Sequence, residues 1–566
     1  MIDEIHDKDG RRIKALEART LCEALQLTAS ERPGQVAHRT LDGSVEFTFG
    51  EYAERVRALA TGLHSLGVRR GDTVALMLVN RPEFALADTA AMHLGAIAFS
   101  VYNTLAPEQI NYLLQSSQCR VVVTERGFLP QVLAARTPEI EHVVLVDGES
   151  DGTITLADLG RRQSSGFRFE DAWRECQPDD VLTLIYTSGT TGPPKAVQLT
   201  HAGVMFMARG YASAMPVMVG GRGISYLPLA HVADRAIGYY AGSICFGTTV
   251  TSIPDPRQIA AALVSVRPTA FGGVPRVWEK VRSALVAAGL GDPASLPDAA
   301  KAAVRARIGL DQANWCISGA APASPEVLQY FTDLGLPLNE GWGMSEVSGI
   351  GTINPLSDIR IGTVGRALPG VEVKLGADGE LLLRAPLVMK GYRNDPARTA
   401  EAIDPDGWLH TGDIAEIDGD GYIKIVDRKK EIIINAAGKN MSPANIELSL
   451  RASSPLIAFA VCIGDRRPYN VALVVLDPET SPRWAAGHGL AGGLDELGRH
   501  ADVRSALQAA VDAANAGLAR VEQIRRFAVI GADWQPGGDE LTPTVKLKRK
   551  AIHDKYRAEI EALYRD

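Results

Sequence analysis

Residues 180–198 read DVLTLIYTSGTTGPPKAVQ, and this stretch says more about the fold than any other in the 566-residue chain. The apolar run Val181–Tyr186 has the character of a buried strand, and it leads into glycines and hydroxyls that end at Lys195. Glycines allow tight bends in which backbone N–H groups converge on an anion, and the lysine adds positive charge. A flexible Ser/Thr/Gly linker is the alternative, but linkers seldom follow a buried strand. The stretch therefore predicts a phosphate-binding loop, although it does not match the GxxxxGK[ST] pattern.

The first third of the chain alternates between helical and strand-like patterns. Apolar residues recur at helical spacing from Val56 to Leu66, Thr73–Val79 suits a buried strand, and Arg81–Leu94 is again helical. Such alternation predicts parallel strands covered by helices, with ligands bound in loops beyond the carboxyl ends of the strands. The expected fold class is α/β.

Beyond about residue 370, the pattern changes from alternating helices and strands to hairpins and then to a charged cluster. Two hairpins are expected within residues 370–426, one with its turn at Gly376–Gly379 and one at Asp418–Gly421. A charged cluster follows at residues 427–430, and the remaining residues resemble a small α/β unit. A domain boundary is therefore expected near Asp427.

Composition excludes several classes of protein. The chain has 59 Lys and Arg against 67 Asp and Glu, a net charge of −8, which argues against nucleic acid as a partner because phosphate binding favours a basic surface. Its six cysteines form no CxxC pair, so a disulfide framework is not expected and a reducing cytoplasm fits. The charged N-terminus shows no secretory signal. The uncharged stretches 89–107 and 236–254 are interpreted as buried core, and peripheral membrane contact stays open.

The YTSGTTGPPK motif resembles the phosphate loop of the adenylate-forming superfamily, which includes acyl-CoA synthetases, luciferases and peptide-synthetase adenylation domains. Six further motifs follow in the order that the superfamily shows. They are LPLAH at 227–231, SGAAP at 318–322, GWGMSE at 341–346, WLHTGD at 408–413, VDRKKEIII at 426–434 and TPTVKLKRK at 542–550. The stretch from Asp406 to Lys430 is similar to the signature of fatty acyl-CoA synthetases, and LPLAHVADR resembles long-chain and bubblegum-type members.

The resemblance implies a large N-terminal domain of several α/β subdomains, residues 1–426, and a small mobile α+β C-terminal domain, residues 431–566. Residues 427–430 would form the hinge, with Lys430 at its end. One orientation of the C-terminal domain would bring Lys546 to ATP, and the other would open a tunnel for the pantetheine of CoA. The residues presented to that tunnel would be Gly438, Lys439 and Asn440.

The resemblance also implies a role for each matched residue. Lys195 would act on the ATP phosphates, His231 would lie beside the incoming carboxylate, and Lys546 would contact the α-phosphate and the carboxylate. Glu346 would hold Mg²⁺, which prefers carboxylate and phosphate oxygens. The residues matched to ATP binding are Thr187, Ser188, Gly189, Thr190, Thr191, Gly192, Ser318, Gly319, Ala320, Ala321, Pro322, Gly341, Trp342, Gly343, Met344, Ser345, Asp413 and Arg428.

Some of these matches have finer implications. Asp413 and Arg428 would bind the ribose, residues 319–322 would form the adenine slot, and Trp342 occupies the position of an aromatic residue that stacks on the base. Lys546 lies in a basic segment that, taken alone, is typical of a solvated helix start. Lys548 is the alternative register for the same role.

The expected activity is ATP-dependent ligation of a long-chain fatty acid to coenzyme A. The reaction would pass through an acyl-adenylate, release AMP and pyrophosphate, and need no cysteine nucleophile. Positive charges and donors must be fixed around the phosphates because charge develops there. The alternatives are a fatty acyl-AMP ligase that loads a carrier protein, an aryl or other acid:CoA ligase, and an inactive acyl-binding protein. Residues 273–280, GVPRVWEK, are expected to help form the wall of the acyl tunnel.

Overall fold

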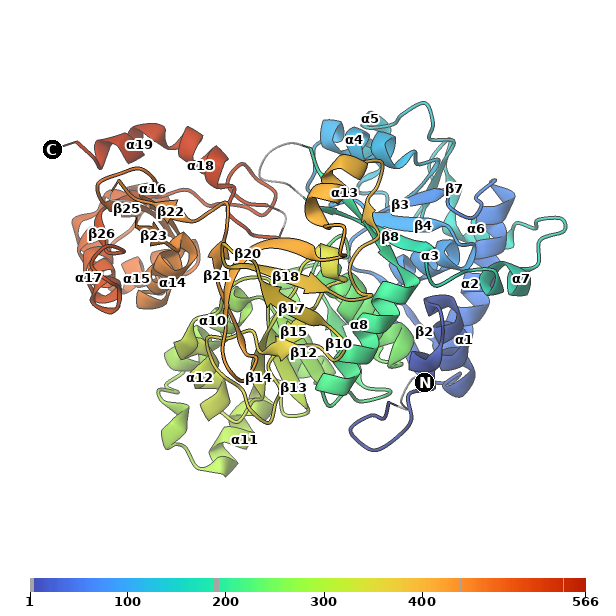
Figure 1. The fold of residues 1–566 in the computed structure, drawn as a ribbon, viewed down its shortest axis with the longest axis horizontal. Helices are drawn as coiled ribbons and strands as arrows, with labels where there is room; N and C mark the ends of the chain where they lie inside the picture. Colours follow the sequence, from blue (N-terminus) through green and yellow to red (C-terminus); the bar gives the residue numbers. More distant parts are fainter. Residues whose placement is uncertain (1–4, 188–192, 437–438, 543, 566) are drawn as a thin grey trace.

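The computed structural model describes residues 5–187, 193–436, 439–542 and 544–565. An eight-stranded sheet has the order β19-β9-β8-β4-β3-β5-β6-β7 and lies on the side of the N-terminal part away from the C-terminal unit (Figure 1). The six strands from β8 to β7 are parallel, as the sequence predicts, whereas β9 and β19 are antiparallel to their neighbours. The strands are β3 (Thr73–Met77), β4 (Ile97–Ser100), β5 (Val121–Thr124), β6 (His142–Leu145), β7 (Ile154–Thr155), β8 (Val181–Thr187), β9 (Lys195–Thr200) and β19 (Gly391–Tyr392).

Both faces of this sheet are buried. Successive side chains of a strand point to opposite faces, so Val74 and Leu76 of β3 pack into one hydrophobic cluster while Ala75 and Met77 pack into another. The first cluster includes residues of α1 (Leu21–Glu31), α2 (Phe49–Ser65) and α3 (Pro82–His93), and the second includes residues of α4 (Pro107–Ser117) and α5 (Leu129–Ala134).

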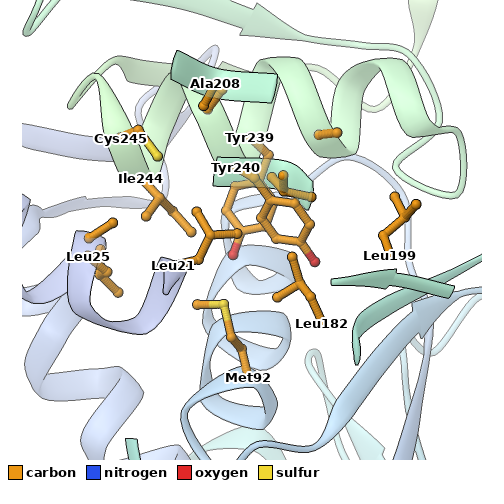
Figure 2. Close-up of a cluster of buried hydrophobic side chains, with 14 of the residues drawn as sticks. Leu21, Leu25, Met92, Leu182, Leu199, Ala208, Tyr239, Tyr240, Ile244 and Cys245 are labelled. Carbon is orange, nitrogen blue, oxygen red and sulfur yellow. The ribbon is translucent and has the colours of Figure 1, made fainter. Parts of the chain in front are cut away.

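A π-helix, η2 (Ala233–Cys245), packs on the first cluster. Figure 2 shows Tyr239 and Tyr240 of this helix in the middle of the cluster, with Leu21, Leu182 and Leu199 around them. The uncharged stretch 236–254 is therefore core, as expected. Among the described residues, no helix combines the length and apolar character needed to cross a bilayer.

Three smaller sheets complete the N-terminal part. The first has the order β10-β11-β1-β2, the second β12-β13-β14-β15-β16, and the third β17-β18-β20-β21. The third contains both predicted hairpins. The strands are β1 (Val36–Thr40), β2 (Glu46–Thr48), β10 (Arg222–Ser225), β11 (Thr249–Ser252), β12 (Ala270–Gly273), β13 (Trp315–Ser318), β14 (Leu338–Trp342), β15 (Thr352–Ile353), β16 (Arg366–Ala367), β17 (Glu372–Leu375), β18 (Glu380–Arg384), β20 (Leu409–Ile417) and β21 (Ile423–Arg428).

The helices that accompany these sheets are mostly short. They are η1 (Lys14–Glu17), α6 (Leu156–Arg161), α7 (Phe169–Arg174), α8 (His201–Ala214), η3 (Pro256–Gln258), α9 (Ile259–Val266), α10 (Pro275–Ala287), η4 (Pro293–Ser295), α11 (Asp298–Arg307), α12 (Pro325–Asp333), η5 (Ser345–Val347) and α13 (Pro396–Ala402). Pro275 begins α10, where its fixed φ and missing N–H suit the first turn of a helix.

The residues after β21 build a unit with hydrophobic clusters of its own. Figure 1 shows it, in orange to red, beside the sheet of β20 and β21 and next to α10. Its elements are β22 (Ile433–Ile434), β23 (Asn440–Met441), α14 (Pro443–Ser453), β24 (Ile457–Ile463), β25 (Asn470–Leu476), α15 (Thr480–Gly487), α16 (Leu494–Arg499), α17 (Ala501–Gly517), β26 (Ile524–Ile530), α18 (Arg549–Lys555) and α19 (Arg557–Ala562).

Candidate active site

A cavity of about 910 Å³ lies between the N-terminal sheets and the C-terminal unit. It brings together residues that are far apart in the sequence. The predicted site residues that line it are Thr187, Lys195, His231, Gly319, Ala320, Gly341, Trp342, Gly343, Met344, Ser345, Glu346, Arg428, Lys430 and Lys546. The predicted residues Ser188, Gly189, Thr190, Thr191, Gly192 and Gly438 lie outside the described residues.

Lys195 and Glu346 are linked through Tyr392. Lys195 begins β9, opposite Thr187 of β8, and its Nζ lies 4.6 Å from the centroid of the Tyr392 ring. The Tyr392 hydroxyl donates a hydrogen bond of 2.9 Å to Oε1 of Glu346. Glu346 is buried, and Oε2 accepts no hydrogen bond within the described part of the chain. One carboxylate oxygen is thus oriented by Tyr392 while the other remains available to a cation.

The peptide leading to Glu346 needs glycine for steric reasons. β14 ends at Trp342, and a Cβ on Gly343 would lie 2.1 Å from the backbone oxygen of Gly349. A side chain at residue 343 would therefore force apart the two backbone segments that hold Glu346 in η5.

Asp413 is buried beside Gly412, which lines the cavity, but does not line the cavity itself, and it contacts two partners. The Trp342 indole N–H donates to Oδ2 at 2.7 Å, and the Arg428 guanidinium lies 2.8 Å from Oδ1. Asp413 and Arg428 face each other across β20 and β21, so the sheet register sets this ion pair. Burial raises the pKa of Asp413, and the positive charge of Arg428 opposes that rise. Stacking of Trp342 on a base stays a prediction.

The predicted adenine slot follows β13. Ser318 and Pro322 bracket this turn, and Ala320 adopts a positive φ of 69°. Ser318 Oγ is buried and forms no hydrogen bond within the described residues. The slot thus offers the small residues Gly319 and Ala320 to the cavity, while the unused Ser318 hydroxyl is buried behind them. Ser318, Ala321 and Pro322 are not among the residues that line the cavity.

His231 lines the cavity just before η2. Its Nδ1 accepts a hydrogen bond of 3.3 Å from the Ala233 backbone N–H, which places the proton of the neutral ring on Nε2. Burial, together with the positive charge of Lys546, lowers the pKa of His231 to about 4. At neutral pH the ring is therefore an uncharged hydrogen-bond donor.

Lys546 enters the cavity from the segment before α18. Thr542 and Lys546 exchange hydrogen bonds, which fixes the loop, and Val545 adopts a positive φ of 63° in the turn. Lys546 is exposed to the open cavity that it lines. Partial desolvation by the protein around it, together with the positive charge of Arg428, lowers the pKa of Lys546. Lys548 instead donates to the Gly538 carbonyl oxygen at 2.7 Å and does not line the cavity.

Lys439 and Asn440 are exposed on the C-terminal unit and do not line the cavity. Asn440 pairs with Ile434 in a two-stranded ladder, and Lys439 bonds to Asn435. This orientation therefore brings Lys546, and not residues 439–440, to the site.

The segment 273–280 has two roles rather than one. Gly273 and Val274 line the cavity, and a place for them in the wall of an acyl tunnel stays a prediction. The following residues, in α10, instead contact the C-terminal unit, where Arg276 lies 2.5 Å from Asp477 and Lys280 lies 3.0 Å from Glu479.

Comparison with known proteins agrees with this geometry. Residues 25–393 match the family model described as AMP-binding enzyme, and residues 430–566 match that of the AMP-binding enzyme C-terminal domain. The chain belongs to the AMP-binding enzyme family. This confirms the resemblance to adenylate-forming enzymes and the α/β fold with a large and a small domain.

The chain is similar to two curated proteins named as fatty-acid–CoA ligases and to a solved adenylation domain. The chain is 46% identical over 450 residues to a putative fatty-acid–CoA ligase, fadD11, of Mycobacterium tuberculosis, covering 73% of this chain and 79% of the relative. It is 34% identical over 569 residues to the long-chain-fatty-acid–CoA ligase FadD15 of Mycobacterium bovis, covering 94% of each. The adenylation domain of a carboxylate reductase from Mycobacterium chelonae shares the fold with a TM-score of 0.80 at 24% identity, covering 98% of this chain and 92% of that one.

Tyr392 is the residue of the site that the sequence did not reveal. It lies in a two-residue strand outside every recognised motif, and its place depends on the pairing of β19 with β9. The local signal is Gly391, with a φ of 139°, because a Cβ there would lie 2.7 Å from a carbon of Thr399.

Proposed function

We propose that this enzyme ligates a long-chain fatty acid to coenzyme A through an acyl-adenylate. The observation that carries the proposal is the meeting of Lys546 of the C-terminal unit with His231 and Glu346 in one cavity. The relatives named as fatty-acid–CoA ligases at 46% and 34% identity support the choice of substrates. The proposed substrates are a fatty acid, ATP and CoA.

ATP would lie along the polar side of the cavity. Asp413 accepts a hydrogen bond from Trp342 on Oδ2 and forms an ion pair with Arg428 through Oδ1. A carboxylate offers about four acceptor sites, so both ribose hydroxyls could still bind. The base would enter the slot at residues 319–322, and Lys195 with the preceding loop would bind the β- and γ-phosphates. Stacking on Trp342 would complete the nucleotide site.

Glu346 fits a role in binding Mg²⁺. Its second oxygen is available, and Mg²⁺ usually takes one or two carboxylates together with phosphate oxygens. No group of three or more His, Cys, Asp and Glu side chains suited to a metal occurs in the described ranges, so the phosphates would supply further ligands. When bound, Mg²⁺ would neutralise charge on the phosphates.

The protein groups would act on the first step as follows. The fatty acid carboxylate attacks the α-phosphorus of ATP, and pyrophosphate leaves. Lys546 stabilises the negative charge that develops on the α-phosphate, and the Nε2–H of neutral His231 donates to the carboxylate and keeps it oriented. The CoA sulfur then attacks the acyl carbon of the mixed anhydride, and AMP leaves.

The second step needs a different arrangement of the C-terminal unit. We place the hinge at residues 427–430 with Lys430 at its end, between domains 1–426 and 431–566. β21 ends at Arg428, and the elements that follow pack in separate hydrophobic clusters, which supports this boundary. Rotation would withdraw Lys546 and bring residues 438–440 to the pantetheine of CoA.

A panel of acids assayed with and without CoA tests the proposal. Long saturated fatty acids should stimulate AMP release strongly and only when CoA is present. Accumulation of acyl-AMP with no effect of CoA would identify an acyl-AMP ligase, and preference for benzoate would identify an aryl-CoA ligase. No ATP consumption with any acid would indicate an inactive acyl-binding protein.

We also propose peripheral contact of the enzyme with a membrane surface, and co-sedimentation with anionic phospholipid vesicles tests this contact.

A further inference from the structure

An acidic side chain with no role in the chemistry described above lies in the cavity wall among apolar residues, where the proposed function would place the acyl chain. Asp234 is the second residue of η2, three residues after His231, and it is 8% exposed. It lines the cavity together with apolar neighbours such as Val232, Ile237 and Phe246. A carboxyl group in such surroundings is costly unless its oxygens are hydrogen-bonded.

The side-chain hydrogen bonds of Asp234 are one-sided. Ser225 donates to Oδ2 at 2.8 Å and Asn80 donates to the same oxygen at 3.1 Å. Asn80 is itself fixed because it also donates to the Leu227 carbonyl oxygen at 2.8 Å. Within the described part of the chain, no side chain donates to Oδ1. The carboxyl group is therefore held rigidly by one oxygen while the other lacks a side-chain partner.

Gly238 leaves Oδ1 uncovered. A Cβ on Gly238 would lie 2.4 Å from Oδ1, so any larger residue there would displace the carboxyl group. Gly238 lines the cavity, and so does Gly242 one turn further along η2. The absence of a side chain at residue 238 therefore keeps Oδ1 of Asp234 open to the cavity.

The raised pKa of Asp234 agrees with a carboxyl group that lacks a full set of hydrogen-bond donors. Burial raises the pKa of Asp234 to about 7, although the hydrogen bonds from Ser225, Asn80 and the Tyr226 backbone oppose that rise. An unsubstituted hydrocarbon chain would leave Oδ1 desolvated without a side-chain donor. A hydroxyl group on the chain would supply that donor.

We propose that Asp234 recognises a hydroxyl group on the acyl chain, so that the enzyme prefers a hydroxylated fatty acid to the unsubstituted acid of equal length. This inference rests on the proposed function. Asp234 would act as a specificity-determining residue, with Asn80 and Ser225 holding its carboxyl group in place. The preferred hydroxyl position would be set by the distance from the reacting carboxylate to Oδ1.

The test compares a saturated fatty acid with the set of its positional monohydroxy isomers. For each isomer, kcat/KM for AMP release with CoA is divided by kcat/KM for the parent acid. In assays well above pH 7, where Asp234 is ionised, one isomer, or two with adjacent positions, should exceed the parent by about 10-fold or more, the effect of a hydrogen bond to a charged group. No preference for any isomer, with the parent acid active, would overturn this inference alone. Inactivity with every acid would instead overturn the proposed function.

Two variants test whether the preference for a hydroxylated acid comes from Oδ1 of Asp234. Asp234→Ala removes the acceptor, and Gly238→Ala leaves the carboxyl group in the chain but displaces Oδ1. In both, the ratio for the preferred isomer should fall to about 1. Gly242→Ala is the matched control, since it adds the same methyl group on the same helix and should keep the ratio. If Asp234→Ala does not fold, Gly238→Ala still decides. A preference that persists with Gly238→Ala would overturn the assignment.

Discussion

Replacement of Arg276 by methionine should shift the enzyme away from the arrangement that holds Lys546 in the cavity. Arg276 donates to Asp477 at 2.5 Å and to the Ala458 carbonyl oxygen at 3.0 Å, and its guanidinium lies 5.5 Å from the ring centroid of Phe459. All three partners belong to the C-terminal unit. Methionine keeps the apolar stem of the side chain but removes both hydrogen bonds and the charge.

The size of the effect follows from the burial of the pair. The side chains of Arg276 and Asp477 are 25% and 8% exposed, so the pair is intermediate between a surface and a buried interaction. A surface ion pair contributes up to about 1 kcal/mol, and a buried hydrogen bond to a charged group contributes about 1.5–3 kcal/mol. A loss of about 1–2 kcal/mol changes the ratio of the two arrangements by about 5- to 30-fold. Each half-reaction rate is proportional to the population of its own arrangement, so the ratio of the two rates changes by the same factor.

The assay measures ATP–pyrophosphate exchange and, separately, thioester formation from preformed acyl-adenylate and CoA. Arg276→Met should lower the ratio of exchange to thioester formation by about 5- to 30-fold. Lys280→Met is the control, because its partner Glu479 is exposed and the pair should change the ratio by less than about 5-fold. An equal loss in both half-reactions, or no change in either, would refute this reasoning.

Three further predictions concern the site. Glu346→Gln should raise the Mg²⁺ concentration needed for half-maximal exchange, and a metal titration checks this. Tyr392→Phe should cause a shift in the same titration of about 10-fold, the usual cost of losing a group that orients a metal ligand. The low pKa of His231 means that unfolding takes up a proton between pH 6.5 and about 4, so wild-type stability falls there. The stability advantage of wild type over His231→Asn should therefore shrink as pH drops through this range, as urea unfolding at several pH values would show.

The regular elements were predictable because their signals are local. The hairpin of β17 and β18 has glycines at its turn, and the observed strands, Glu372–Leu375 and Glu380–Arg384, flank the expected turn at Gly376–Gly379. The π-helix η2 was not predictable in this way. Its Arg235 is completely buried against Asp88, which is 147 residues away in the sequence, so the register of the helix depends on tertiary contacts.

The site residues also fall into two groups: some could be predicted from local sequence, and others depend on tertiary contacts. Glu346 and Trp342 lie within one contiguous motif, so the sequence alone could single them out, and both line the cavity. Tyr392 and Arg276 could not be predicted in this way, since each acts on a partner supplied by another part of the fold. Tyr392 reaches Glu346 only when β19 joins β9, and Arg276 reaches Asp477 only when the C-terminal unit packs on α10.

The most direct test of the proposed mechanism is the effect of Lys546→Ala on the two half-reactions. Lys546 is proposed to stabilise charge in the first step and to be withdrawn in the second. ATP–pyrophosphate exchange should therefore fall by about 100-fold or more, the cost of losing one fixed donor at a developing charge. Thioester formation from preformed acyl-adenylate and CoA should stay close to the wild-type rate. An equal fall in both half-reactions would contradict the proposed role of Lys546.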